Sequence, residues 1–200
     1  MRVLFVAHSF PRFVGDAAGS FLLRLARGLV DRGIEVEALV PHARGLAGDE
    51  RIGGIVVHRF RYAPTGLETL AYTGTMAEQV RAGLRGKGAL VGLVAAGAAA
   101  AIERTRRFGA DVIHAHWWFP GGLAGTAASL ATGVPLVTTS HGSDVRLVRT
   151  IPGGTRLLRV VVGRSAEFTA VSTWLGDELR RAAPKAPDIE RPSVWREAAK

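Results

Sequence analysis

Short, continuous apolar segments alternate along the chain with longer segments in which apolar residues recur at helical spacing. The first apolar segment, Arg2 to Ala7, has the pattern of a parallel strand that is buried on both faces. A glycine-containing loop follows, then a helix with apolar positions from Phe21 to Leu29 and Ser20 as its expected N-cap, and then a strand from Ile34 to Val40. This order of elements predicts a right-handed βαβ unit.

The same alternation of strands and helices continues to residue 183. We expect further strands at 55–62, 111–115, 136–140 and 167–171, and helices at 76–84, 89–107, 123–131, 154–162 and 173–183. Residues 42–54 are polar and are expected to be irregular. The predicted fold class is therefore α/β, with a Rossmann-like, open, mostly parallel sheet and helices on both faces.

The end of the chain departs from this alternation. Residues 184–200 hold Pro184, Pro187 and Pro192, followed by a segment that fits a short helix, 193–200. We therefore expect one domain over residues 1–183 and a tail over residues 184–200 whose helix packs back on the domain.

Composition narrows the class of protein. The hydrophobic content of 48% indicates a globular chain, and the absence of cysteine excludes disulfides and thiolate metal sites. No targeting segment is evident, because the apolar run at residues 1–7 is too short for a signal peptide. The longest apolar stretch, residues 89–102, is shorter than the roughly 20 residues that span a bilayer. We expect a soluble or peripheral protein.

The net charge of +9 favours anionic partners, although a genomic bias toward arginine explains it equally well. One basic set is either a face toward anionic lipid or an ordinary solvated helix surface, and both readings stay open; its members are Arg81, Arg85, Lys87, Arg104, Arg106 and Arg107. A nucleic-acid partner is not expected, because the tryptophans at 117, 118, 174 and 195 do not interleave with these cations.

Polar turns follow two of the expected strands. One carries His116 and Trp117, and the other carries His141, Ser143 and Asp144. Ligands of open parallel sheets bind at the carboxyl ends of the strands, so these two turns predict a binding site. His141 is the sharpest candidate, because a neutral imidazole can donate a hydrogen bond to a sugar hydroxyl or a phosphate oxygen.

The sequence also raises three other kinds of chemistry: a metal site, a hydrolase triad and an anion-binding turn. A metal held by His114, His116 and His141 is not expected, since no acidic or thiolate ligand clusters nearby, and His114 fits a core histidine. A hydrolase triad of Ser143, His141 and Asp144 fails, because residues so close on one loop cannot form the relay and no Gly-x-Ser-x-Gly motif exists. The first loop, Gly15 to Gly19, is either an anion-binding turn or a plain tight turn.

Several segments together resemble one known family. They are RVLFVAHSFPR, GSFLLRLARGLVDRGIEVEALVP, RYAP with LETLAY, DVIHAHWWFPGG, VPLVTTSHGSDV and AVSTWLGDEL, which run in order over residues 1–183. The set resembles the N-terminal domain of glycosyltransferase family 4 (group 1), the retaining nucleotide-sugar transferases with the two-domain GT-B fold. SVWREAA near the end of the chain is similar to the closing helix that crosses back onto the first domain in GT-B enzymes.

The resemblance implies a role for each candidate residue. His141 is implied as the catalytic residue that contacts the transferred sugar or the acceptor. The acceptor side is implied to comprise His116, Trp117, Ser143 and Asp144. The loop near the donor phosphates maps to Gly15, Gly19 and Ser20. Family members need no metal or other cofactor, so none is expected here.

The resemblance also implies partners that the chain does not supply. The chain would be the acceptor-binding half of a transferase that uses a nucleotide-sugar donor and an unknown acceptor. The family's diphosphate-binding Arg and Lys and its Glu-x7-Glu segment are expected beyond residue 200, on a donor-binding domain or a partner chain. Without them nothing offsets the charge on the leaving group, so we expect no efficient transfer by this chain alone.

Two further expectations concern the role and place of the chain. The alternative function is a non-enzymatic Rossmann-like domain that binds a small molecule or an anion. The expected location is cytoplasmic, with peripheral contact at the inner face of an anionic membrane as an open possibility.

Overall fold

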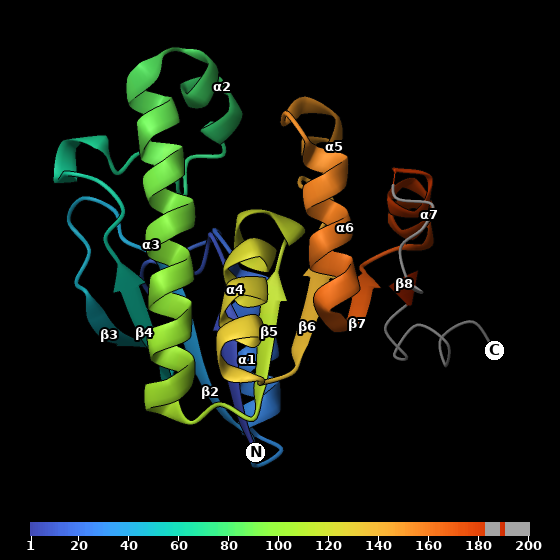
Figure 1. Cartoon of the computed structure of the whole chain (residues 1–200). Coiled ribbons are helices and arrows are strands. Elements are labelled where there is room, and N and C mark those ends of the chain that lie inside the picture. Colours follow the sequence, from blue (N-terminus) through green and yellow to red (C-terminus); the bar gives the residue numbers. More distant parts are fainter. Residues whose placement is uncertain (183–188, 191–200) are drawn as a thin grey trace.

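A single sheet organises the molecule (Figure 1). The structure, a computed structural model, describes residues 1–182 and 189–190. Within them the strand order is β3-β4-β2-β1-β5-β6-β7-β8, and only the β3–β4 pair is antiparallel. The strands are β1 Arg2–Val6, β2 Glu35–Pro41, β3 Asp49–Ile52, β4 Ile55–Phe60, β5 Val112–His116, β6 Leu136–Ser140, β7 Ser165–Ala170 and β8 Ile189–Glu190.

Helices cover both faces of the sheet. Figure 1 shows α3, α4 and α6 in front of the strands and α1 behind them. The helices are α1 Ser20–Val30, α2 Met76–Arg81, α3 Leu84–Phe108, α4 Leu123–Thr132, α5 Leu147–Thr150, α6 Gly154–Arg164 and α7 Thr173–Ala182, with helical turns η1 Thr65–Leu67 and η2 Trp118–Gly122. This architecture confirms the predicted Rossmann-like α/β fold.

The central strand shows why the sheet needs two helical layers. Side chains alternate along β1, so Val3 and Phe5 pack in the cluster that contains α1, whereas Leu4 and Val6 pack in the cluster that contains α3 and α4. All four are almost fully buried, which explains the continuous apolar run in the sequence. The order of the strands reverses between β1 and β5, and that switch point is where open α/β sheets bind ligands.

Three elements differ from the sequence-based expectation. Residues 42–54 are not wholly irregular, because β3 forms a hairpin with β4. The short helix α5 was not expected, nor was β8, which pairs with β7 inside the supposed tail. The expected helix over residues 193–200 lies outside the described residues. Ser20 does not cap α1, because the N-cap is Gly19 in a left-handed conformation and no side chain caps the helix.

The apolar stretch at residues 89–102 belongs to a longer helix than expected. α3 has 25 residues and starts before Gly86, where a glycine is required because a Cβ would overlap the backbone of Gln79. By length and composition α3 could cross a membrane. In the fold, however, a stripe at every fourth residue is buried; it comprises Ala89, Leu93, Gly97, Ala101 and Thr105.

The basic set is spread over α2 and the two ends of α3. Arg85 and Arg106 lie near opposite ends of α3, roughly 30 Å apart at a rise of 1.5 Å per residue. Arg104 binds the carboxylate of Glu37 on β2 at 2.5 Å. These positions do not decide between a lipid-facing and a solvated surface, and peripheral membrane contact stays a prediction.

Candidate acceptor site at the carboxyl ends of three strands

Three neighbouring strands bring histidines to one edge of the sheet. His8 lies two residues beyond β1, His116 ends β5, and His141 follows β6 directly. These strands are adjacent in the order β1-β5-β6, so turns that are 25 or more residues apart in sequence meet at the switch point. The structure thus brings together His116 and His141, as the strand pattern predicted.

Three histidines, His114, His116 and His141, form a contiguous stack, whereas His8 packs on Trp117. Nδ1 of His116 lies 3.1 Å from Nε2 of His141, and the rings of His114 and His116 have centroids 4.2 Å apart. Burial lowers the pKa of His8 and of His114 to about 4 and that of His141 to about 3. The pKa of His116, which is fully buried, also lies well below its ordinary value. All four imidazoles are therefore neutral at neutral pH.

Unpaired atoms indicate which nitrogen of His141 carries hydrogen. Nε2 of His116 is buried with no hydrogen-bond partner among the described residues. An unpaired lone pair is less costly there than an unpaired N–H, so we assign the proton of His116 to Nδ1, which donates to Nε2 of His141. His141 then carries its own proton on Nδ1, which has no partner within the described part of the chain. His141 thus presents a neutral N–H donor.

Trp117 adopts an unusual backbone conformation between the two histidine turns. Its φ of 62° lies in the left-handed region, which costs a non-glycine residue on the order of 1–3 kcal/mol. The backbone N–H donates to Thr139 and the indole N–H donates to Oγ of Ser143 at 3.1 Å. The ring packs against His8 and His141. Strain held by so many contacts points to a functional position.

Asp144 ties the two turns together from within. Its carboxylate accepts hydrogen bonds from the backbone N–H of Trp118, the hydroxyl of Ser140 and the backbone N–H of Gly142. The residue is only 1% exposed, and burial raises the pKa of its carboxyl group. Since its oxygens are already engaged, Asp144 orders the loop after β6 and does not present a free carboxylate.

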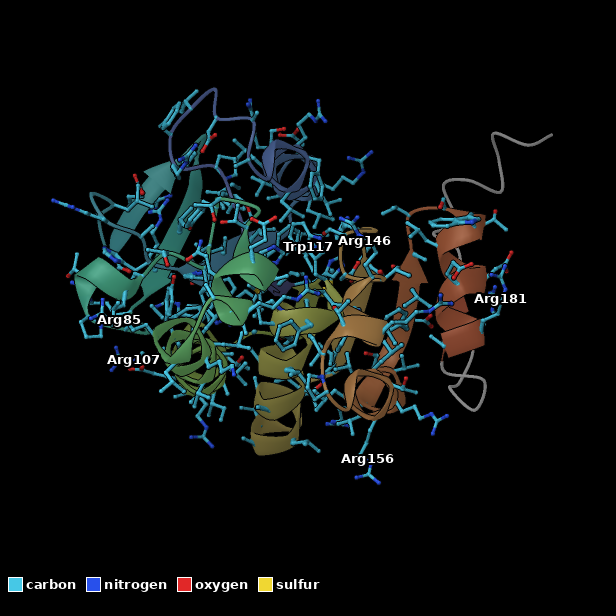
Figure 2. All side chains as sticks on the ribbon, turned by 90° about the horizontal axis from the view of Figure 1, so that it is seen from above. Arg85, Arg107, Trp117, Arg146, Arg156 and Arg181 are labelled. Atoms are coloured by element: carbon cyan, nitrogen blue, oxygen red, sulfur yellow. The ribbon has the colours of Figure 1, made fainter. Side chains whose placement is uncertain are left out.

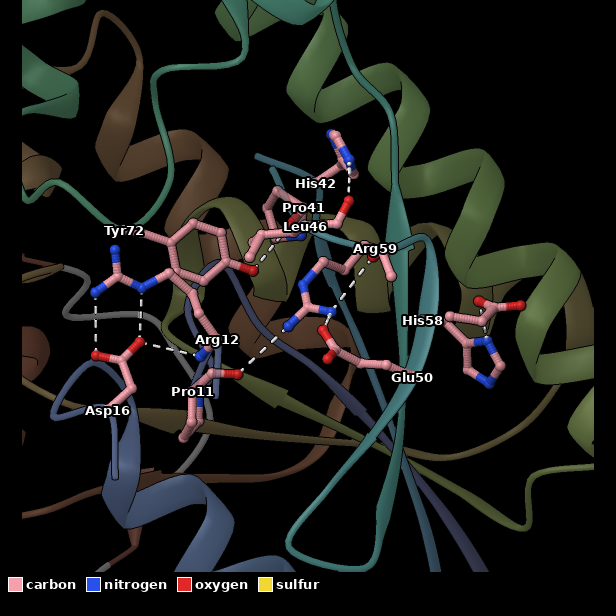
Figure 3. A network of polar contacts seen from close by, with 12 residues as sticks. Pro11, Arg12, Asp16, Pro41, His42, Leu46, Glu50, His58, Arg59 and Tyr72 are labelled. Carbon is pink, nitrogen blue, oxygen red and sulfur yellow. Dashed lines mark hydrogen bonds and ion pairs between the residues drawn. The ribbon is translucent and has the colours of Figure 1, made fainter. Parts of the chain in front are cut away.

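The loop between β1 and α1 is ordered by an ion pair. Asp16 accepts hydrogen bonds from the guanidinium and backbone N–H of Arg12 and from the backbone N–H of Ala18 (Figure 3). Arg12 holds the pKa of the Asp16 carboxyl group well below its usual range. The negative charge of Asp16 is thus neutralised inside the loop.

The three residues implied for donor phosphates are placed differently from one another. Gly19 has a φ of 69°, and a Cβ there would lie 2.8 Å from the Cα atom of Phe10, so only glycine fits. Gly15 is exposed at the tip of the loop, and Ser20 is the first residue of α1. Of the three, only Gly19 borders the main pocket.

A buried arginine supports this loop from the neighbouring strand. The Arg59 side chain is completely buried on β4, pairs with Glu50 of β3 and donates to the backbone carbonyl of Pro11 (Figure 3). Tyr72 donates to the carbonyl of Pro41, and burial raises its pKa to about 12. Sequence reasoning missed both residues. An arginine within the apolar run of β4 was the one available signal.

The main pocket lies between these loops and has a volume of about 610 Å³, within the range typical of small-molecule sites. Its walls come from the β1–α1 loop, the segment from Leu70 through α2, the turn after β5 and the loop after β6. Among the residues predicted for the site, the pocket is lined by Gly19, Trp117, Ser143 and Asp144. His116 is fully buried, and the half-buried His141 packs on the ring of Trp117 with centroids 4.8 Å apart; neither is part of this lining.

The histidine stack is not a metal cluster in this geometry. Within residues 1–182 and 189–190, no group of three or more His, Asp or Glu side chains is placed to hold a metal ion. His116 and His141 direct ring nitrogens at each other. The sequence-based expectation that the chain needs no metal or other cofactor stays a prediction.

Comparisons with known proteins agree with this architecture. The chain is 29% identical over 90 residues to N-acetyl-alpha-D-glucosaminyl L-malate synthase of Bacillus anthracis, an alignment covering 44% of this chain and 24% of that protein. It is 35% identical over 72 residues to the putative teichuronic acid biosynthesis glycosyltransferase TuaC of Bacillus subtilis (strain 168), covering 36% and 18%. The matches thus span a quarter or less of these relatives.

Solved structures share the fold at low sequence identity. A chain of sucrose-phosphate synthase from Thermosynechococcus elongatus superimposes with a TM-score of 0.64 at 16% identity, covering 100% of this chain and 93% of that one. A longer chain of the same enzyme gives a TM-score of 0.62 at 15% identity, and this chain spans 47% of it.

The sequence also matches a known family. The family model of Glycosyltransferase Family 4 matches residues 18–195, which is most of the sequence. The chain therefore belongs to Glycosyltransferase Family 4.

Proposed function

We propose that this chain is the acceptor-binding half of a retaining glycosyltransferase that uses a nucleotide-sugar donor. Membership of the family supports sugar transfer as the reaction. The observation that carries the acceptor role is the pocket of about 610 Å³, where Trp117 and Ser143 come together from two strand-end loops beside His141. An aromatic wall with a few fixed polar groups is the composition of a small-molecule site.

His141 serves this function as a positioned hydrogen-bond donor. With a pKa of about 3, its imidazole is too weak a base to accept a proton near pH 7. Its Nδ1–H is instead fixed in direction, because Nε2 is held by His116. A donor fixed before the substrate arrives loses little energy to reorganisation as the reaction proceeds, so it stabilises developing charge on a sugar oxygen.

We do not assign the groups that bind the nucleotide-sugar donor to this chain. Gly19, at the left-handed entry of α1, is the residue of the first loop that borders the pocket, so the donor diphosphate would approach there. The groups that neutralise the leaving diphosphate would belong to a second half of the enzyme. This division agrees with the fact that the chain spans 47% of a solved sucrose-phosphate synthase chain.

The proposal is tested by supplying the second half. The purified chain is mixed with a separately expressed donor-binding half of a Family 4 enzyme, its nucleotide sugar and a panel of acceptors, and release of nucleoside diphosphate is followed. We expect acceptor-dependent release from the mixture and background rates from either half alone, with the anomeric configuration of the donor kept in the product. Equal rates with and without this chain would contradict the proposal, and binding of a small molecule without any transfer would favour a non-enzymatic domain.

A further inference from the structure

Two arginines line the main pocket. Arg81 is the last residue of α2, and Arg146 precedes α5 in the loop after β6. Within the described residues, neither guanidinium group makes a hydrogen bond or an ion pair. Figure 2 shows Arg146 beside Trp117, near the centre of the carboxyl-end face, whereas Arg85 and Arg156 lie at the periphery.

Several arginines in the described part of the chain are paired with carboxylates. Such pairs join Arg12 to Asp16, Arg59 to Glu50, Arg61 to Glu68, Arg104 to Glu37, Arg107 to Glu103 and Arg149 to Glu178. The pocket lacks such a match. Of its two acidic residues, Asp144 is engaged by three internal donors, and Glu78 is exposed on α2 with no partner among the described residues.

The free polar groups of the pocket are therefore mainly donors. Each guanidinium offers five N–H groups in a planar fork, which matches the oxygens of a carboxylate or a phosphate. The two groups come from different walls, α2 and the loop after β6, so one anion between them could be bound from two sides. His8, which also lines the pocket, is neutral because burial lowers its pKa to about 4, and so adds no charge of its own.

Part of the remaining lining is apolar. Leu70, Met76, Phe119 and Leu147 face the same space as the two arginines. A ligand that fits this lining carries its charge at one end and leaves an uncharged body against the apolar wall and Trp117.

We propose that the acceptor carries an anionic group, a carboxylate or a phosphate, and that Arg81 and Arg146 bind this group. The term acceptor rests on the proposed function, whereas binding of the anion does not. The two arginines would set which acceptors enter the pocket and would position them for transfer at His141.

The test is a titration of the isotope-labelled 200-residue chain with inorganic phosphate and with succinate, at constant ionic strength in chloride. We expect saturable shifts of the Trp117 indole N–H and of the Nε–H groups of both arginines. Arg81→Gln and Arg146→Gln should each weaken binding about tenfold or more, because each variant loses a charge-assisted hydrogen bond to the anion. Arg156→Gln removes an equally exposed charge on α6 and should leave the affinity unchanged.

A second arm distinguishes the source of the anion. Binding of the chain to anionic phosphatidylglycerol vesicles is compared with binding to neutral phosphatidylcholine vesicles. A lipid headgroup would be identified if the chain bound only the anionic vesicles and this binding required Arg81 and Arg146. Absence of saturable shifts with both soluble anions and with vesicles would overturn the inference, as would an equal effect of Arg156→Gln. Transfer to neutral acceptors that is insensitive to both arginines would overturn the inference and leave the proposed function standing. Anion binding by the chain without any transfer in the mixing assay would leave the inference standing and contradict the proposed function.

Discussion

Acidification from pH 7 to pH 5 is expected to destabilise this domain steeply. Four histidines, of which His8 contacts Trp117 and the others pack on one another, are neutral when folded. Their pKa values are about 4 for His8 and His114 and about 3 for His141, and that of His116 is also well below 6.5. In the unfolded chain each would titrate near 6.5. The unfolded state therefore binds more protons, and stability that is complete above pH 6.5 is lost as the pH falls toward 4.

The expected slope follows from the number of protons. Each histidine contributes about 1.4 kcal/mol per pH unit, so four contribute at most about 5 kcal/mol per unit near pH 5. Asp144 acts in the opposite sense, because its raised pKa means that the folded chain holds the proton more tightly, but one such group offsets at most one histidine. Typical domains have only about 5–15 kcal/mol of stability, so this chain should unfold before pH 4.

Urea unfolding followed by tryptophan fluorescence at half-unit steps from pH 8 to pH 4.5 measures this dependence. Above pH 7 the free energy of unfolding should be nearly constant, which provides an internal control. Replacing His114 with Gln should reduce the slope below pH 6 by about one proton. A free energy of unfolding that stays flat between pH 7 and pH 5 would show that the histidines are not held neutral.

Replacement of His141 by Ala is expected to lower the rate constant of transfer about 100-fold in the assembled enzyme. The variant loses a fixed N–H donor, and removal of such a donor typically costs 10²–10³ in rate. The pocket itself should persist, because Trp117 is also held by Ser143 and by the backbone of Thr139. We therefore expect the effect mainly in kcat, with a small change in KM for the acceptor.

Two variants make this result specific. His141→Asn keeps an N–H donor near the same place and should recover part of the lost rate. His58→Asn changes a histidine on β4 that bonds to Asp49, away from the strand ends, and should leave kcat unchanged. The rate is measured as nucleoside diphosphate release, with the thermal unfolding midpoint of each variant recorded alongside. More than half of the wild-type kcat in His141→Ala would contradict the role assigned to His141.

Much of the fold could be predicted because its strands are buried on both faces. The continuous apolar run of β1 and the glycine at the end of α4 are local signals that tertiary packing reinforces. The β3–β4 hairpin was missed, although Gly53 and Gly54 form the two-residue turn that such hairpins favour, because Asp49, Glu50 and Arg51 read as a polar loop.

The position of the site in the fold could be predicted from the sequence, but the contacts among its buried residues could not. Strand order alone placed His116 and His141 at one edge, since parallel strands end together. Burial of His116 and engagement of Asp144 by three donors depend on contacts between distant segments, which no local pattern encodes. Arg59 was missed for the same reason, because its partner Glu50 belongs to the strand that was not foreseen.

The acceptor role is tested most directly by exchanging donor halves. This chain is combined in turn with the donor-binding halves of two Family 4 enzymes that use different nucleotide sugars, and both products are identified by mass spectrometry. We predict that the transferred sugar changes with the donor half while the preferred acceptor stays the same, because the pocket at Trp117 and Ser143 selects it. An acceptor preference that changes with the donor half would contradict the account.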